Sequence, residues 1–155
     1  MNKHEVIQHH FPDFSGTQAE QLISLESQVK AWNEKINVVS RKDIDNLFTR
    51  HILHSLAFCK VISFEPGTTL LDGGTGGGFP GLPLAIAYPD AEFHLVDSTR
   101  KKLDVVEAIA AELGLKNVTT EHARLEKLKG KVDFILGRAV TNLPQFIKWS
   151  MKRVR

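Results

Sequence analysis

The hydrophobic positions of this chain change their spacing near residue 66. In residues 1–65 they recur at intervals of three and four, as in Leu22, Leu25 and Val29, and this spacing places them on one face of a helix. A second helix is predicted over residues 43–60, after which a Pro-Gly pair breaks the pattern. We therefore expect the first 65 residues to form an N-terminal helical extension.

From residue 68 onward, short apolar runs alternate with segments of helical spacing. This alternation predicts a parallel sheet with crossover helices on both faces, in an α/β domain over residues 66–155. Four strands and an unfinished crossover also lead us to expect that C-terminal strands of the domain are missing. The predicted strands are residues 69–72, 92–97, 117–121 and 132–137, and the predicted helices are residues 80–88, 100–113 and 143–155.

A glycine-rich loop directly follows the first predicted strand. Asp72 ends the strand, and every position from 73 to 78 except Thr75 is glycine, which includes the candidates Gly74, Gly76 and Gly78. Glycines let a backbone approach a ligand closely, and a carboxylate at the end of the next strand, here Asp97, can accept the hydroxyls of a ribose. The pattern is typical of a Rossmann-like sheet that holds a nucleoside-bearing cofactor.

Two cofactor classes compete for this loop. Residues 76–81 match the G-x-G-x-x-G pattern, so a nicotinamide dinucleotide is one candidate. A pyrophosphate needs a helix N-terminus free of negative charge, and Asp72 lies just upstream. S-adenosylmethionine (SAM) has no phosphate and carries a cationic amino group and a sulfonium. The acidic residue therefore favours SAM, and the dinucleotide remains the alternative.

Later residues offer further candidates at strand ends. Asp97 has a second interpretation, as a cap of the following helix. Residues 122–126, which contain Arg124, Leu125 and Glu126, follow the third predicted strand and either wall an adenine pocket or form a surface salt bridge. Arg138 ends the fourth strand among apolar neighbours, where a guanidinium can bind a phosphate or a carboxylate with two hydrogen bonds.

Composition narrows the class of protein. The chain has 155 residues, 42% hydrophobic and 25% charged, with a formal net charge of +2, as expected of a globular domain. No apolar run is long enough to span a bilayer, and the single cysteine, Cys59, is expected to pack in the core, so we expect a cytoplasmic protein. The pair His51 and His54 lacks further metal-ligand types nearby and is interpreted as structural or substrate-facing. Basic clusters at residues 100–102, 127–131 and 152–155 either contact nucleic-acid phosphates or are solvated helix faces.

Several motifs together resemble a known family, the RsmG/GidB group of bacterial SAM-dependent methyltransferases. The resemblance covers essentially the whole chain, and the ending GFPG at residues 78–81 distinguishes this group from most SAM enzymes. Three positions, Gly73, Gly137 and His54, depart from the commoner pattern of the group. The motifs are WNEKIN at residues 32–37, RHILHS at 50–55, DGGTGGGFPG at 72–81, LVDS at 95–98, GLKNV at 114–118, HAR at 122–124 and RA at 138–139.

The resemblance implies an activity and a set of site residues. Members of the group methylate N7 of a guanine in the 16S RNA of the small ribosomal subunit, so the implied partner is that RNA and the implied state is a monomer. Arg124 and Arg138 are implied to serve the RNA or the reaction. The alternatives that remain are a nicotinamide oxidoreductase and an inactive fragment that binds SAM or RNA. The implied SAM pocket is formed by Gly74, Gly76, Phe79, Asp97, Leu125, Glu126 and Arg138.

Overall fold

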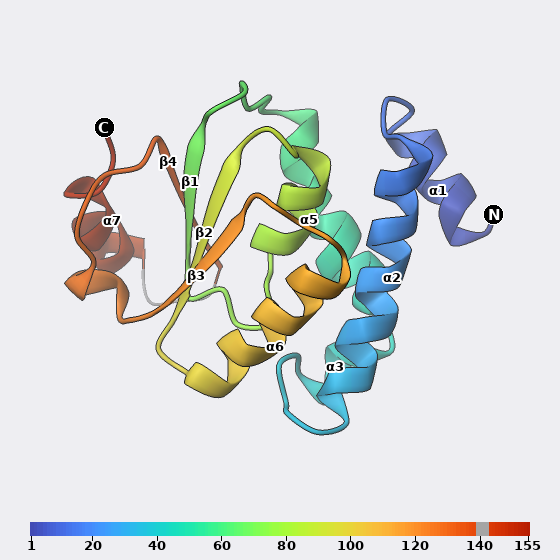
Figure 1. The fold of residues 1–155 in the computed structure, drawn as a ribbon, viewed down its shortest axis with the longest axis horizontal. Coiled ribbons are helices and arrows are strands. Elements are labelled where there is room, and N and C mark those ends of the chain that lie inside the picture. Colours follow the sequence, from blue (N-terminus) through green and yellow to red (C-terminus); the bar gives the residue numbers. More distant parts are fainter. Residues whose placement is uncertain (139–142) are drawn as a thin grey trace.

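A four-stranded parallel sheet forms the centre of the molecule (Figure 1). The computed structural model describes residues 1–138 and 143–155. The strand order β3-β2-β1-β4 places the first strand inside the sheet, with β2 on one side and β4 on the other. All pairs are parallel, so the carboxyl ends of the strands meet at one edge. The strands are β1 (Thr69–Gly73), β2 (Glu92–Asp97), β3 (Val118–His122) and β4 (Phe134–Gly137).

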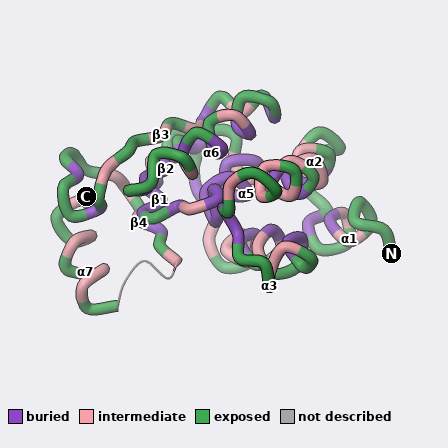
Figure 2. Tube along the Cα trace, turned by 90° about the horizontal axis from the view of Figure 1, so that it is seen from below, coloured by how far each residue is buried: buried purple, intermediate pink, exposed green. Residues whose placement is uncertain are grey.

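The larger hydrophobic core lies between one face of the sheet and the helices that cover it. Figure 2 shows the buried parts of α2 and α5 turned toward each other and toward the strands. Strand residues alternate between the two faces, so Leu70 and Leu95 enter this core while Leu71 and Val96 enter the opposite one. The helices on this face are α1 (Lys3–His10), α2 (Gly16–Asn33), α5 (Gly81–Ala87) and α6 (Arg100–Glu112).

A smaller core covers the other face. There the short helix η3 (Leu125–Lys127) and helix α7 (Leu143–Met151) pack over Leu71 and Val96, and Phe146 of α7 joins them. Figure 1 shows α7 on the side of the sheet opposite α5 and α6. Crossover elements thus lie on both faces, which confirms the predicted parallel α/β architecture.

The segment predicted as one helix over residues 43–60 is helical but interrupted, which corrects the prediction. A turn at residues 45–46 separates α3 (Arg41–Ile44) from the rest, and η1 (Phe48–Leu53) is a π-helical stretch. A π-helical turn holds one residue more than an α-helical turn, so the faces of the helix rotate along its axis. Phe48 and Ile52 are buried in the core. The path continues through α4 (His54–Leu56) and η2 (Ala57–Lys60).

The third strand starts at Val118, one residue later than predicted, and the side chain just before it, Asn117, contacts the end of α5. Its Nδ2 lies 3.1 Å from the carbonyl oxygen of Ala85 and 3.0 Å from those of Tyr88 and Ala91. Asn117 is 6% exposed and closes the end of α5. The fourth strand likewise begins at Phe134 rather than Val132, which forms an isolated bridge with Val154.

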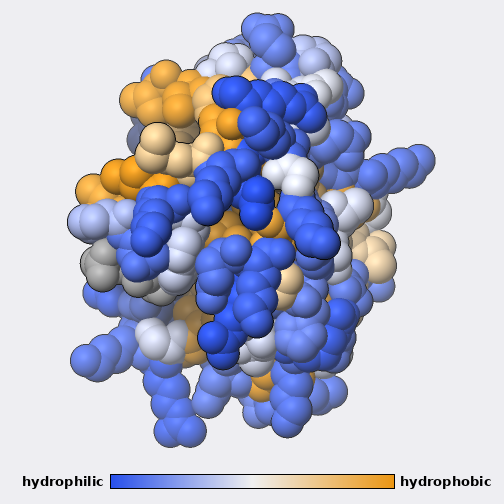
Figure 3. Space-filling model, turned by 90° about the vertical axis from the view of Figure 1, so that its left-hand side faces the viewer, coloured by the Kyte–Doolittle hydropathy of each residue, from blue (hydrophilic) through white to orange (hydrophobic). Residues whose placement is uncertain are grey.

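The face formed by β4 and α7 carries hydrophobic side chains at the surface. Figure 3 shows this side of the molecule, where hydrophobic groups lie among hydrophilic ones. Phe134 of the edge strand β4 is 41% exposed, and Leu143 and Met151 of α7 are more so. Within the described residues, no helix combines the length and apolar character needed to cross a membrane.

The substitution Asn117→Asp tests the closure of α5. The two side chains have the same size, but a carboxylate cannot donate to the three carbonyl oxygens and is repelled by them. We expect the free energy of unfolding at pH 7 to fall by about 2 kcal/mol or more. Urea denaturation measures this change, with the exposed neighbour Lys116→Ala as the control. An equal stability of Asn117→Asp and the control contradicts the assigned role.

Candidate cofactor and substrate site

The glycine-rich loop leaves β1 at the carboxyl edge of the sheet and leads to α5. Gly74, Gly76 and Gly78 have φ angles of +69°, +58° and +96°, a region that side chains disfavour. At Gly78 a Cβ atom would lie 2.4 Å from Cδ1 of Leu82, so both φ and space require glycine there. The glycines therefore set the path of the loop, as the sequence predicted for a cofactor-binding turn.

Asp72 lies beneath this loop and holds it. The residue is 1% exposed, and its Oδ2 accepts hydrogen bonds from Thr75 Oγ1 at 2.7 Å and from the backbone N–H of Gly81 at 2.9 Å. Burial raises the pKa of Asp72 to about 7, although both hydrogen bonds act in the opposite direction. Its Oδ1 is buried and has no hydrogen-bond partner among the described residues. One carboxylate oxygen thus fastens the loop to α5, and the other is free for a donor.

Asp97 fastens the same loop from the second strand. Its Oδ2 accepts from the backbone N–H of Gly76 at 2.8 Å, and its Oδ1 accepts from that of Thr99 at 2.9 Å. The contact with Thr99 orders the residue just before α6. No side-chain hydrogen bond caps the helix itself, so the capping interpretation is not confirmed. Asp97 also lines a cavity next to the loop, so the position required for the ribose interpretation is present.

That cavity has a volume of about 250 Å³ and lies at the carboxyl edge of β1 and β2. Five candidate residues from the sequence line it, namely Gly74, Asp97, Arg124, Leu125 and Glu126. Arg124 and Glu126 are both exposed, and neither forms an ion pair within the described residues. Both side chains are therefore available to a ligand. The remaining lining residues are Ser98, Ala123 and Trp149.

Trp149 is a residue that the sequence did not reveal as part of the site. It belongs to α7, more than twenty positions after η3, and it reaches the cavity because α7 packs on η3 and on the second core. No motif or spacing links position 149 to position 125, so only the tertiary packing brings the indole beside Leu125.

Arg138 and Phe79 lie outside this cavity. Arg138 follows β4 and lines a second, mainly apolar hollow of about 350 Å³ with Phe58 and His54. Phe79 is 6% exposed, and its ring centroid lies 5.4 Å from that of His51. The structure thus divides the predicted residues between two neighbouring regions of the carboxyl edge. Ala139, part of the motif with Arg138, lies outside the described residues.

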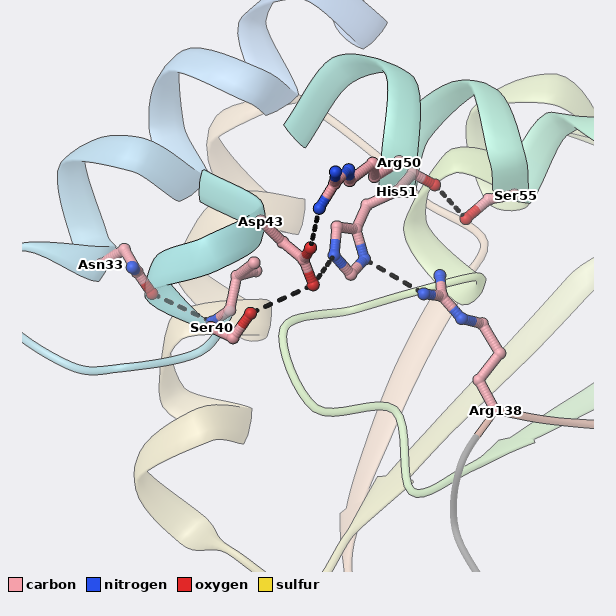
Figure 4. Close-up of polar contacts among 8 residues, drawn as sticks. Asn33, Ser40, Asp43, Arg50, His51, Ser55 and Arg138 are labelled. Atoms are coloured by element: carbon pink, nitrogen blue, oxygen red, sulfur yellow. Dashed lines mark hydrogen bonds and ion pairs between the residues drawn. The ribbon is translucent and has the colours of Figure 1, made fainter. Parts of the chain in front are cut away.

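His51 occupies the space between the N-terminal helices and Arg138. Figure 4 shows the imidazole with Asp43 on one side and Arg138 on the other. Its Nε2 lies 3.3 Å from Asp43 Oδ2, and its Nδ1 lies 3.2 Å from Arg138 Nη2. Among the described residues, no group of three or more histidine, cysteine or acidic side chains gathers as a metal site would require. The contacts with Asp43 and Arg138 give the histidine a structural role.

The basic clusters differ in their contacts. Arg100 pairs with Asp104 and Glu107 of its own helix, as expected for a solvated helix face. Arg155 pairs with Asp133, whereas Lys127 is exposed beside η3. Cys59 is partly buried against the main core, and burial raises the pKa of its thiol. The cysteine is therefore a packing residue, as predicted.

The fold and the loop at its carboxyl edge define a Rossmann-like protein of the class I methyltransferase type. One solved structure with this fold is coclaurine N-methyltransferase bound to N-methylheliamine and SAH, with a TM-score of 0.60 and 14% identity, covering 97% of this chain and 53% of that one. A family model described as rRNA small subunit methyltransferase G matches residues 18–155. The chain belongs to this family, known as GidB.

Curated relatives agree with the family match. The chain is 53% identical over 146 residues to Ribosomal RNA small subunit methyltransferase G of Flavobacterium johnsoniae, covering 94% of this chain and 70% of the relative. It is 54% identical over 145 residues to the protein of the same name from Christiangramia forsetii, covering 94% of this chain and 69% of the relative. The resemblance read from the motifs is therefore confirmed.

The buried carboxyl group of Asp72 gives the stability of the protein a specific pH dependence. The native state keeps this proton up to about pH 7, while the unfolded chain loses it near the usual aspartate pKa of 3.8. Between these values the native state binds more protons, so stability falls as pH rises. Relative to Asp72→Asn, we expect wild type to lose at most about 1.4 kcal/mol per pH unit over this window. Urea denaturation at pH 5 and pH 7 measures the free energy of unfolding of both proteins. An equal change with pH in wild type and Asp72→Asn contradicts the prediction.

Proposed function

We propose that this chain transfers the methyl group of SAM to N7 of a guanine in the 16S RNA of the small ribosomal subunit. Membership of the rRNA small subunit methyltransferase G family carries the reaction class and the RNA substrate. The cavity formed by Gly74, Asp97, Leu125 and Glu126 beside the glycine-rich loop is the structural observation that supports the cofactor. The oxidoreductase alternative is not favoured by the relatives.

The residues at the loop fit SAM better than a dinucleotide. Asp72 Oδ2 already accepts the N–H of Gly81, the first residue of α5, so a carboxyl group occupies the helix end that a pyrophosphate needs. The unpartnered Oδ1 of Asp72 can instead accept from the amino group of SAM. Asp97 lines the cavity with a carboxylate for ribose hydroxyls, and Leu125 and Trp149 offer apolar surface to the adenine.

SAM, when bound, supplies a methyl group on a positively charged sulfur, and N7 of guanine has a lone pair and no proton to lose. The site therefore needs no general base, and its work is to hold the base in line with the methyl group. Arg138 lies at the carboxyl end of β4, beside the cavity that His54 and Phe58 line. We assign it to the guanine nucleotide, to whose oxygen atoms a guanidinium can donate, and Arg124 to the RNA or the reaction.

The remaining parts of the proposal concern organisation and partners. We propose that residues 1–65 are a helical extension of a SAM-binding domain formed by residues 66–155, in line with the packing of α2 on α5 and α6. The exposed lysines beside η3 are available to RNA phosphates. The protein is proposed to act as a monomer in the cytoplasm, on the small subunit or its RNA.

Asp97 tests the cofactor assignment. The variant Asp97→Ala removes the carboxylate that faces the cavity, and loss of hydrogen bonds from ribose to a charged group weakens binding by about tenfold or more. Isothermal titration with SAM measures the affinity, with the exposed α6 carboxylate variant Asp104→Ala as the control. Asp97→Asn keeps one acceptor oxygen and is expected to lie between the two. Unchanged SAM affinity of a folded Asp97→Ala protein rejects the assignment of Asp97 to the ribose. Tighter binding of NADH than of SAM by wild type supports the oxidoreductase alternative instead.

Transfer of radiolabelled methyl from SAM to small subunits tests the reaction. We expect label at guanine N7 in 16S RNA with wild type, and a rate lower by about a hundredfold with Arg138→Ala. Because Arg138 does not line the cavity of Asp97, its variant is expected to keep most of the SAM affinity. SAM binding without any label points to a binding fragment, and label on another atom or RNA overturns the substrate.

A further inference from the structure

Three side chains from three different elements form a line that ends at Arg138, which lies 87 positions after His51. Asp43 comes from α3, His51 from η1 and Arg138 from the end of β4 (Figure 4). The two contacts, 3.3 Å from Asp43 Oδ2 to His51 Nε2 and 3.2 Å from His51 Nδ1 to Arg138 Nη2, use both ring nitrogens. Side chains of the N-terminal helices thus contact Arg138, the residue proposed to bind the guanine nucleotide.

The donors and acceptors along this line permit only one arrangement of the imidazole proton. A guanidinium can only donate, so His51 Nδ1 must carry a lone pair and accept from Arg138. The proton of the neutral ring is then on Nε2 and is donated to Asp43. A doubly protonated ring has no acceptor to offer, and it carries a charge of the same sign as Arg138. The contact therefore requires neutral His51.

Asp43 is itself held in place on its other side. Its Oδ1 accepts from Arg50 Nη1 at 3.0 Å, and its Oδ2 accepts from Ser40 Oγ at 3.0 Å. The Arg50, Ser40 and His51 hydrogen bonds keep the pKa of Asp43 below its usual value. The side chain of His51 is 14% exposed and packs on the ring of Phe79 from the glycine-rich loop. The imidazole is thus fixed by both neighbouring elements.

Arg138 has an unused donor. Its Nη1 is buried and has no hydrogen-bond partner among the described residues, while Nη2 is taken by His51. A buried donor without a partner costs free energy, which a bound acceptor recovers. The guanine nucleotide offers such acceptors in its base and phosphate oxygens.

We propose that His51, oriented by Asp43, is a positioning residue for Arg138. Its Nδ1 fixes one side of the guanidinium, so that Nη1 is presented to an acceptor oxygen of the guanine nucleotide. This inference rests on the proposed function for the identity of that nucleotide, but the contact itself is independent of it. His51 touches neither substrate nor cofactor in this assignment and acts only through Arg138.

The groups around His51 give the proposal a pH signature. Burial lowers the pKa of His51 below its usual 6.5, and the Arg138 charge and His54 act in the same direction, while Asp43 raises it. Arg50 faces the ring only through Asp43. Methyl transfer should therefore be constant near neutral pH and fall on acidification through the lowered pKa, as protonated His51 releases Arg138.

Two amide substitutions of His51 distinguish the role of Nδ1 from that of Nε2. In His51→Asn the amide lies near the place of Nδ1 and can accept from Arg138, whereas in His51→Gln the amide lies near the place of Nε2 and reaches only Asp43. We expect His51→Asn to keep kcat within about threefold of wild type and His51→Gln to lower it by about tenfold or more, the worth of one charged hydrogen bond. SAM affinity should be unchanged in both, and His51→Asn should lose the acidic decline.

Side-chain ¹⁵N NMR of the full chain tests the contact without any methyl transfer. We expect His51 as the Nε2–H tautomer, and a higher His51 pKa in Arg138→Met, because that variant removes a cation and a donated hydrogen bond. An Nδ1–H tautomer, or a pKa unmoved by Arg138→Met, overturns the contact even if the amide variants fail to fold. Equal kcat and equal pH profiles of wild type and His51→Gln overturn the positioning role. Absence of methyl transfer by wild type refutes the proposed function instead, and the NMR result then stands by itself.

Discussion

The carboxyl group of Asp72 is the contact on which the arrangement of the site depends. It lies at the end of a central strand, is almost fully buried, and binds both Thr75 of the loop and the first N–H of α5. Because a buried carboxyl without partners is costly, the loop and the helix must both stay in register with the strand. Asp97, at the end of the neighbouring strand, holds the same loop by accepting a hydrogen bond from the backbone N–H of Gly76. Two carboxyl groups therefore hold one loop in a shape that its glycines alone would not fix.

A cavity lies beside this anchored loop, and a second hollow lies at the end of β4. The cavity of Asp97 and Leu125 lies toward β2 and η3, and the hollow beside Arg138 lies toward β4 and the N-terminal helices. Phe79 at the end of the loop packs on His51, so the loop also contacts the line that leads to Arg138. The N-terminal helices are thereby more than a cover for the sheet, since they supply the imidazole and carboxylate that fix an arginine at its carboxyl edge.

Local sequence patterns predicted the structure correctly where it depends on residues close together in the chain. The bounds of β2 and the left-handed residue Gly114 after α6 agree with the sequence, because alternation and glycine conformation act within a few positions. The prediction of one continuous helix over residues 43–60 was wrong, because a turn at residues 45–46 and a π-helical stretch interrupt it. The contacts of the Asn117 side chain could not be predicted either, because they join carbonyl groups far away in sequence.

The sequence by itself determined the parallel α/β class, the glycine-rich loop and the two acidic residues at adjoining strand ends, because strand polarity and backbone conformation follow from local residue types. Only the tertiary structure decided that Trp149 faces Leu125, that Arg138 lies in a different hollow from Asp97, and that His51 joins Asp43 to Arg138. Arg138 lies 87 positions after His51, and Trp149 and Leu125 belong to different elements. Their proximity results from how helices pack on both faces of the sheet, and no spacing along the chain records that packing.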